Sequence, residues 1–289
     1  MRIRLPEKNK YYPKDTQSIF SSLRHISVPG DWNFYYFFNM PFILENRDGL
    51  PQKIRINEGI ENFKWNSDLL KNLKNRKEKL IQSLRFTGFK VETIQATCNW
   101  RLIIGLGAAH PQETSMTLHH IYGIPYIPGS AIKGVTRHWA ILKFSDEKAK
   151  NEGRDFLKVI EEVANALESG KEINLEVDGI NFRQLIEIFG TQQKRGEVIF
   201  MDAFPVENIN LKIDIMNPHY PDYYGKGEPP ADWQNPNPIK FLTVEKTKFQ
   251  FYLLSRNDEL LWISKKLLEE ALKEHGIGAK TSLGYGIFE

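Results

Sequence analysis

Residues 124–137 read IPYIPGSAIKGVTR, and this stretch decides the architecture that we expect around it. Each proline restricts the residue before it to an extended conformation, so the backbone should reach residue 129 as an extended lead-in. A helix is expected to begin directly afterwards, with Ser130 as its N-cap. Its apolar positions follow helical spacing and would face a core: Ala131, Ile132, Val135, Trp139, Ala140 and Leu142.

The polar side of this helix start has the composition of a phosphate-binding surface. Free N–H groups and the helix dipole favour an anion beside Gly129 and Ser130. Lys133, Gly134 and Arg137 follow along the helix, so these five residues are candidates for gripping a nucleic-acid backbone. The alternative is a serine-capped helix with two solvated cations, and spacing alone favours this plainer interpretation. The stretch does not match the GxxxxGK[ST] pattern, which excludes a P-loop nucleotidase.

A second glycine-rich element, GIGAKTSLGYG, occupies residues 276–286. We expect a helix capped by Ser264 before it and a final strand over 285–288 after it. An ordinary helix-to-strand turn would need fewer than its four glycines, so we expect a sugar-phosphate chain to approach its backbone closely. The residues expected to contact that chain are Gly278, Lys280, Thr281, Gly284 and Gly286.

The remaining segments predict an α+β protein. Helical periodicity or capping residues indicate helices over 66–84, 155–168 and 182–189, whereas apolar and β-branched runs indicate strands over 92–104, 197–204 and 240–254. Helices between non-adjacent strands favour a ferredoxin-like (RRM-like) sheet with its helices on one face. Residues 91–289 are expected to form this core, and residues 1–90 a basic N-terminal extension with an amphipathic helix.

Charge is distributed unevenly along the chain. Residues 1–90 carry 17 Lys/Arg against 9 Asp/Glu, although the net charge of the whole chain is only +3. An anionic partner for this region is one interpretation, and lysines on a solvated helix face are the other. No apolar run reaches the roughly 18 residues of a membrane helix, so we expect a cytoplasmic protein without a membrane partner. Cys98 is the single cysteine, and we expect neither a disulfide nor a metal or cofactor site.

Residues 217–238 have a composition that resists regular structure. They contain six prolines, and we expect a projecting loop. Exposed aromatic side chains can stack on bases or on a partner, or they can fold back onto their own domain. The candidates for stacking are Tyr220, Tyr223, Tyr224 and Trp233.

Three histidines allow an enzymatic alternative. His110, His119 and His120 lie near Glu113 in the sequence, and such groups can act as general base and acid in metal-free RNA cleavage. The neighbours His119 and His120 would, however, point to opposite sides of an extended segment. No HxxxH or CxxC pattern accompanies them, so a structural or solvated role is favoured over catalysis.

Residues 124–137 closely resemble the IPGSSxKGxxR signature of the repeat-associated mysterious proteins (RAMPs) of CRISPR-Cas systems. Three further matches occur in the family's order along residues 95–289. They are Gly105-Leu-Gly with His119, Phe189-Gly190 followed by residues 196–203, and the element at 276–286. Within the family, the chain is most similar to the sixth RAMP subunit of the type III-B (Cmr) effector complex.

This resemblance implies a subunit that binds the 3′ region of the crRNA at the end of the backbone filament. Its partners would be the crRNA, the target RNA and other Cmr subunits, above all the repeated RAMP backbone subunit. The family's slicing aspartate lies in the loop before the first helix, and residues 105–128 contain no aspartate, with Glu113 as a weak substitute. A noncatalytic role is therefore expected. A crRNA-processing endoribonuclease that uses His119 or His120 and a subunit of the related Csm complex are the alternatives.

Overall fold

The computed structural model describes residues 33–39, 43–45, 51–53, 61, 63–110, 114–217, 227, 229 and 238–289. The chain forms two compact units, and each is assembled from three separate segments. Unit 1 comprises Met1–Leu69, Gly105–Pro125 and Ile209–Glu245, and unit 2 comprises Leu70–Ile104, Tyr126–Asn208 and Lys246–Glu289. Helices and strands occur together, which confirms the predicted α+β class.

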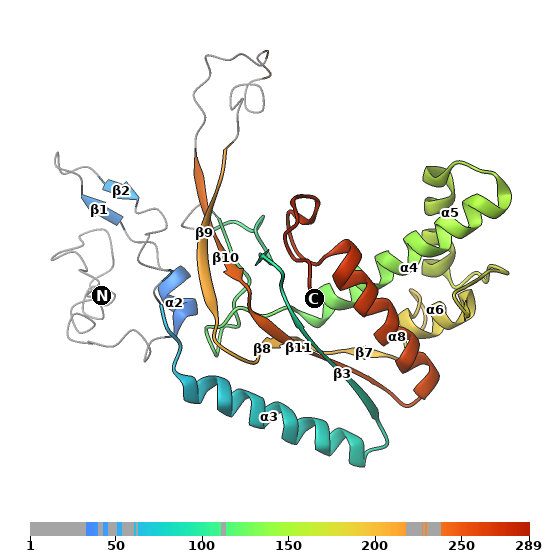
Figure 1. Ribbon diagram of the computed structural model, residues 1–289, viewed down its shortest axis with the longest axis horizontal. Coiled ribbons are helices and arrows are strands. Elements are labelled where there is room, and N and C mark those ends of the chain that lie inside the picture. The colour runs from blue at the N-terminus through green and yellow to red at the C-terminus, as the bar shows by residue number, and fades with distance from the viewer. Residues whose placement is uncertain are drawn as a thin grey trace. The chain divides into compact units, whose positions relative to one another are not determined.

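The sheet of unit 2 is built around strand β11, Lys248–Ser255 (Figure 1). β3, Lys90–Thr97, pairs antiparallel with the full length of β11. The short strands β7, Ile199–Phe200, and β8, Phe204–Pro205, pair antiparallel with other parts of β11. The prediction of one strand over 197–204 was therefore wrong. Met201 still donates to the carbonyl oxygen of Tyr252, but Ala203 pairs with Ile127 instead of β11.

The predicted strand over 240–254 is in fact two strands. β10, Ile239–Glu245, belongs to unit 1 and β11 belongs to unit 2. Lys246 adopts a φ of 42° between them, a left-handed conformation that an extended strand cannot contain. The apolar composition on both sides of Lys246 conceals this break.

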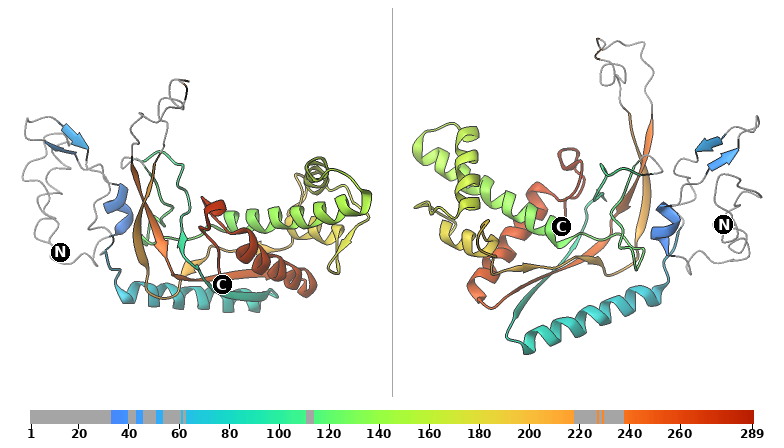
Figure 2. Two further views of the ribbon diagram at one scale, coloured as in Figure 1. Left: turned by 45° about the horizontal axis from the view of Figure 1, so that its top comes forward. Right: turned by 180° about the vertical axis from the view of Figure 1, so that it is seen from behind.

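Helix α3, Ser67–Phe86, covers one face of the unit 2 sheet (Figure 2). Its Ile81 packs against Tyr252 and Leu254 of β11. The Oδ1 atom of Asn66 accepts a hydrogen bond from the backbone N–H of Asp68 at 2.8 Å, which caps the helix start. The helix predicted over 66–84 is thus confirmed.

Four helices form the rest of the unit 2 core. They are α4, Gly129–Glu152; α5, Phe156–Ser169; α6, Phe182–Phe189; and α8, Asp258–Glu270. Their buried apolar side chains form one cluster, and α8 lies on the face of the sheet opposite α3 (Figure 2). The hairpin of β5, Glu176–Val177, and β6, Ile180–Asn181, precedes α6. The predicted helices at 155–168 and 182–189 are confirmed, and Asp155 caps the first of them by accepting from the N–H of Leu157.

Helix α8 begins six residues before the predicted cap at Ser264. Asn257 caps it by accepting from the N–H groups of Glu259 and Leu260. Ser264 is buried inside the helix and donates its hydroxyl to the carbonyl oxygen of Leu260, so the prediction that it starts the helix was wrong. Serine hydroxyls inside helices commonly bond to the carbonyl oxygen one turn back, as Ser264 does here, so a serine need not mark a helix start.

In unit 1, β9, Asn210–Met216, and β10 form an antiparallel hairpin (Figure 1). Strands β1, Ile43–Glu45, and β2, Pro51–Lys53, form a small second hairpin. Helix α2, Phe34–Asn39, contributes to an aromatic cluster with Phe63 and Trp65, whose rings lie 4.7 and 5.2 Å from that of Phe34. All of the aromatic side chains predicted to stack on bases or a partner lie outside the described residues: Tyr220, Tyr223, Tyr224 and Trp233.

The N-terminal segment of unit 1 holds the backbone of the lead-in loop. The Nδ2 atom of Asn33 donates to the carbonyl oxygens of His120 and Ile121 at 3.0 and 2.9 Å, and the Nε1 of Trp65 donates to that of Gly123 at 2.8 Å. A Cβ atom at Gly123 would overlap Asn33, so only glycine fits this approach. In the part of the chain that the structure describes, none of the helices has the length and apolarity to span a membrane.

Candidate nucleic-acid interface

The start of α4 is stabilised by a carboxylate from another segment. The backbone N–H of Gly129 donates to Oδ1 of Asp202 at 2.7 Å. The N–H groups of Ala131 and Ile132 donate to the carbonyl oxygen of Pro128, which is the N-cap residue. Ser130 lies inside the helix, so its predicted capping role was wrong. A phosphate would also meet the charge of Asp202 at this helix terminus, which makes the terminus itself a poor anion site.

The two glycines of α4 have different surroundings. Gly129 is buried, and a Cβ atom there would overlap the carbonyl oxygen of Phe200. Gly134 is exposed, and a Cβ atom there would meet no other group within 4 Å. Packing within the fold therefore explains Gly129, whereas at Gly134 the helix surface is open.

Lys133 and Arg137 lie one turn apart on α4 and are both half-buried. Among the described residues, neither forms an ion pair with a carboxylate, unlike Lys143 on the same helix, which contacts Asp178 and Glu270. Burial lowers the pKa of Lys133, and the positive charges of Arg137 and Arg195 lower it further. This site therefore concentrates uncompensated positive charge. Arg195 was not predicted, because it lies 58 residues beyond Arg137 in a polar turn without a recognisable motif.

The glycine-rich element at 276–286 forms a closed loop. Hydrogen bonds fix the base of this loop to the backbone of residues 101–103, which precede α4. The N–H of Ile277 donates to the carbonyl oxygen of Gly286 at 2.9 Å, and the N–H of Gly286 donates to that of Arg101 at 2.7 Å, in strand β4, Arg101–Leu102. Cβ atoms at Gly278 and Gly286 would overlap the carbonyl oxygens of Ile103 and Ile277, respectively. The fold itself therefore requires these two glycines.

The tip of this loop is presented to solvent. A 3-10 turn, η4, Thr281–Leu283, follows Lys280, and Gly284 closes it with a φ of 89° and open space around its α-carbon. The exposed fraction of Leu283 is 64%. Among the predicted residues of this element, Gly278 and Gly284 are exposed, Lys280 and Thr281 are half-buried, and Gly286 is buried.

The predicted final strand over 285–288 was wrong. Cys98 and Phe288 form only an isolated bridge. Thr97 and Glu289 exchange two backbone hydrogen bonds of 2.9 Å, which continue the same short contact. The positive φ values of Gly284 and Gly286 bend the chain and prevent a regular ladder.

A histidine pair connects α4 with the glycine-rich element. Helix α8 continues into a π-helical turn, η3, Ala271–His275, and this turn ends at Gly276. It places the ring of His275 4.9 Å from that of His138 and 6.4 Å from that of Trp139. The structure thus brings the residue directly after element 129–137 into contact with the residue directly before element 276–286. Their sequence separation left no signal for this contact.

The histidine pair predicts a dependence of stability on pH. Burial lowers the pKa of His138, and the positive charges of His275 and Arg137 lower it further. The unfolded chain, with a histidine pKa of about 6.5, therefore binds more protons than the folded one. The free energy of unfolding should therefore be highest above about pH 6.5, the unfolded pKa. It should fall as the pH drops from there through the lower pKa of the folded state. The melting temperature of His138→Gln, measured between about pH 5 and 8, should fall less on the acid side. Equal acid sensitivity in both proteins would contradict this assignment.

The three candidate histidines, His110, His119 and His120, all contact neighbouring groups within unit 1. His119 and His120 stack with their ring centroids 5.2 Å apart, so the expectation that they point to opposite sides was wrong. A turn at residues 120–122 allows this, with the N–H groups of Ile121 and Tyr122 directed to Nδ1 of His119. His110 stacks on Phe38 and contacts Oδ1 of Asn39 at 3.2 Å. Glu113 lies outside the described residues. The described residues contain no group of three acidic, His or Cys side chains that would hold a metal.

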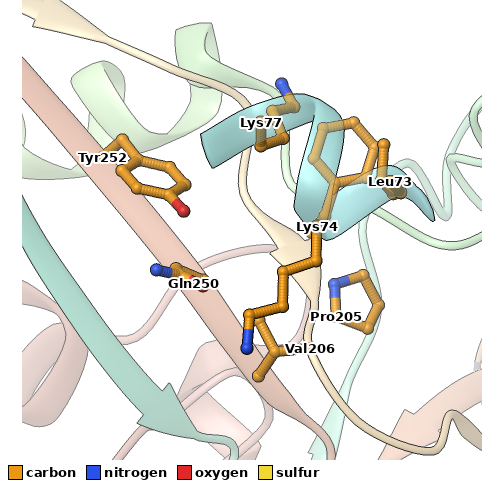
Figure 3. Close-up of a pocket in the computed structure, with 8 residues that line it drawn as sticks. Leu73, Lys74, Lys77, Pro205, Val206, Gln250 and Tyr252 are labelled. Carbon is orange, nitrogen blue, oxygen red and sulfur yellow. The ribbon is translucent and has the colours of Figure 1, made fainter. Parts of the chain in front are cut away.

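Figure 3 shows a pocket between α3 and the sheet of unit 2. Lys77 lies at this pocket, with Nζ 4.6 Å from the ring centroid of Phe204. Burial lowers the pKa of Lys77, and the charge of Asp202 opposes that shift. Lys77 therefore packs inward, and it is the least available lysine of α3 for a phosphate. The pocket is lined by Leu73, Lys74, Lys77, Phe204, Pro205, Val206, Gln250 and Tyr252.

Comparison with known proteins finds similar sequences and structures. The CRISPR system Cmr subunit Cmr6 of Pyrococcus furiosus is 45% identical over 219 residues, which cover 64% of each chain. The crystal structure of Cmr6 from Pyrococcus furiosus matches 70% of this chain and 97% of its own, with a TM-score of 0.50 and 37% identity. A chain of a type III-B Cmr-beta complex bound to cognate target RNA shares the fold, with a TM-score of 0.56, 24% identity, and coverage of 79% of this chain and 66% of its own.

The chain thus spans just under two thirds of the length of the Pyrococcus Cmr6 sequence that it matches. The family match itself extends over residues 97–289, which include α4, the Asp202 segment and the glycine-rich element. On this match, the chain belongs to the RAMP superfamily.

Proposed function

We propose that this chain is a noncatalytic RNA-binding subunit of a type III-B CRISPR effector complex. It binds the 3′ region of the crRNA at the end of the backbone filament, beside the repeated RAMP backbone subunit. The observation that carries the proposal is the positive charge of Lys133 and Arg137 on the signature helix, which no carboxylate of the described residues pairs with. His138 and His275 connect this helix to the turn before the glycine-rich element. The similarity to Cmr6 supports the type of complex, and a likeness to a complex with target RNA is consistent with it.

In this proposal the protein holds the guide by its phosphates and leaves the bases free to pair. Lysine and arginine contacts to phosphates fix the position of an RNA without reading its sequence. Ser130, Lys133, Gly134 and Arg137 supply the helix side of the site. The exposed loop tip supplies Lys280, Thr281 and Gly284. No cofactor or metal takes part in such binding.

The finer architecture belongs to the same proposal. Residues 91–289 form a RAMP core of the ferredoxin-like type, and residues 1–90 form a basic extension for neighbouring subunits or RNA. The loop at 217–238, which the β9–β10 hairpin carries, places its aromatic side chains against bases or a partner subunit. Target RNA then pairs with the guide along the filament.

Loss of either cation should weaken RNA binding by roughly ten- to a hundredfold, because a hydrogen bond to a charged group contributes roughly 1.5–3 kcal/mol. Lys133→Ala and Arg137→Ala should each also reduce the slope of log affinity against log salt by about one phosphate. Fluorescence anisotropy with single-stranded RNA at several salt concentrations measures both effects. Lys158→Ala, which removes an exposed charge of α5, is the matched control.

Unchanged affinity in both α4 variants would refute the proposed RNA site. The noncatalytic part is tested separately with crRNA repeat RNA in the absence of divalent metal. A defined cleavage product that disappears in His119→Ala or His120→Ala would make the protein a processing nuclease. Native mass spectrometry with the other Cmr subunits and a crRNA tests assembly, and failure to incorporate would refute the subunit role.

A further inference from the structure

The chain at Ala203 runs antiparallel to the segment that leads into α4. Ile127 and Ala203 exchange two backbone hydrogen bonds of 2.9 Å. Further along, the carbonyl oxygen of Phe200 lies against the α-carbon of Gly129. α4 also contacts α6 and β7, the helix before and the strand after the turn at 190–196. Figure 1 shows β7, which directly follows this turn, close to α4.

The turn at 190–196 is held in one conformation by its own backbone. Gly190 and Arg195 form a bridge at its base, and the N–H of Thr191 donates to the carbonyl oxygen of Lys194 at 2.8 Å. Cβ atoms at Gly190 or Gly196 would overlap backbone atoms of the facing strand of the turn. Arg195 therefore extends from a fixed base, which reduces the entropy lost when its side chain binds a ligand.

The charges of this turn are arranged asymmetrically. Lys194 has a carboxylate partner, since its Nζ lies 3.8 Å from Oε1 of Glu197. Arg195 is exposed and, among the described residues, has no carboxylate at ion-pairing distance. The positive charge of Arg195 instead lowers the pKa of Lys133, as the charge of Arg137 also does. Lys133 is thus repelled by one cation of its own helix and by one cation of the turn, and an anion beside them would relieve that repulsion.

We propose that Arg195 is a third phosphate-binding residue, so that the 190–196 turn forms a second side of the RNA site facing α4. Its ligand is a phosphodiester of the same RNA strand that Lys133 and Arg137 hold. A planar guanidinium matches the two oxygens of a phosphate, and such bidentate contacts fix the path of the strand. This inference rests on the proposed function and adds an element to its site.

The test compares two neighbouring substitutions on one turn. Arg195→Ala should weaken binding of single-stranded RNA by about five- to tenfold and reduce the salt slope by about one phosphate. Lys194→Ala, which removes an equal charge one residue away, should leave affinity within about twofold of the unchanged chain. Arg195→Lys should recover only part of the lost affinity, because an ammonium cannot bind in the bidentate mode. The melting temperature of RNA-free Arg195→Ala should not fall, since the substitution removes a repulsion.

The outcomes separate this inference from the proposed function. If Arg195→Ala binds normally while Lys133→Ala and Arg137→Ala bind weakly, Arg195 is not in the site and the proposed function stands. Equal loss in Arg195→Ala and Lys194→Ala would reduce the effect to general charge and overturn the inference. If none of the four variants loses affinity, both the inference and the proposed RNA site are wrong.

Discussion

Gly286→Ala should destabilise the protein by about 3 kcal/mol. A left-handed conformation costs an L-residue roughly 1–2 kcal/mol, and Gly286 has a φ of 68°. The added Cβ would also overlap the carbonyl oxygen of Ile277, and relieving such overpacking costs about 1–3 kcal/mol. The displacement would strain the hydrogen bonds that join Gly286 to Ile277 and Arg101. Urea unfolding followed by circular dichroism measures the loss.

Gly284→Ala is the matched control for this prediction. Gly284 also has a positive φ, 89°, but a Cβ there meets nothing within 4 Å. Only the conformational cost of roughly 1–2 kcal/mol should remain. If both substitutions cost the same, the close approach of Gly286 to Ile277 is not what requires glycine. If Gly284→Ala loses more free energy of RNA binding than free energy of unfolding, this result would support contact between the loop tip and RNA.

Asp202→Ala is expected to be the second severe substitution, with a loss of about 2–3 kcal/mol. It leaves the buried N–H of Gly129 without its acceptor, which costs roughly 1–3 kcal/mol. It also removes a negative charge from the start of α4, where a carboxylate contributes about 0.3–1 kcal/mol. The partly buried Lys77 would lose the carboxylate that stabilises its charged form. Thermal and urea unfolding measure the combined loss.

Asp202→Asn distinguishes the hydrogen bond from the charge. The amide oxygen can still accept from Gly129, so only the electrostatic part, about 1 kcal/mol, should be lost. A loss in Asp202→Asn as large as that in Asp202→Ala would show that charge, and not the hydrogen bond, is the main contribution. If neither substitution lowers the stability of the protein, Asp202 does not cap α4.

Local periodicity and capping predicted α3, α5 and α6 correctly, because these helices depend on residues within a few positions of their ends. Asn66 and Asp155 bond to backbone groups two residues away. The predictions that Ser130 and Ser264 cap helices were wrong, because other residues bond to the first backbone N–H groups of these helices. The first residue of α4 bonds to Asp202, 73 residues away, and Asn257 starts α8 earlier than Ser264.

The candidate site was predicted in its parts and not in its assembly. The residues of α4 and of the glycine-rich element were singled out from charge, glycine content and family resemblance. Their meeting through His138 and His275 depends on a π-helical turn that no periodicity predicts. The position of Arg195 near α4 depends on contacts of α4 with α6 and β7, which become visible only in three dimensions. Asp202 lay within a recognised family match, but its bond to Gly129 was not deducible from that match.

The pairing of β3 with β11 also bears on how the protein is made. Thr97 pairs with Lys248 and Lys90 with Ser255, so β3 is translated long before its partner. At about 5–20 residues per second, the ribosome needs roughly ten to thirty seconds to supply β11 after β3. During this interval Ile81 of α3 and Ile94 of β3 have no sheet to cover them. The nascent chain, and not the finished protein, is therefore the form most vulnerable to aggregation, and heterologous production should benefit from slow translation at low temperature.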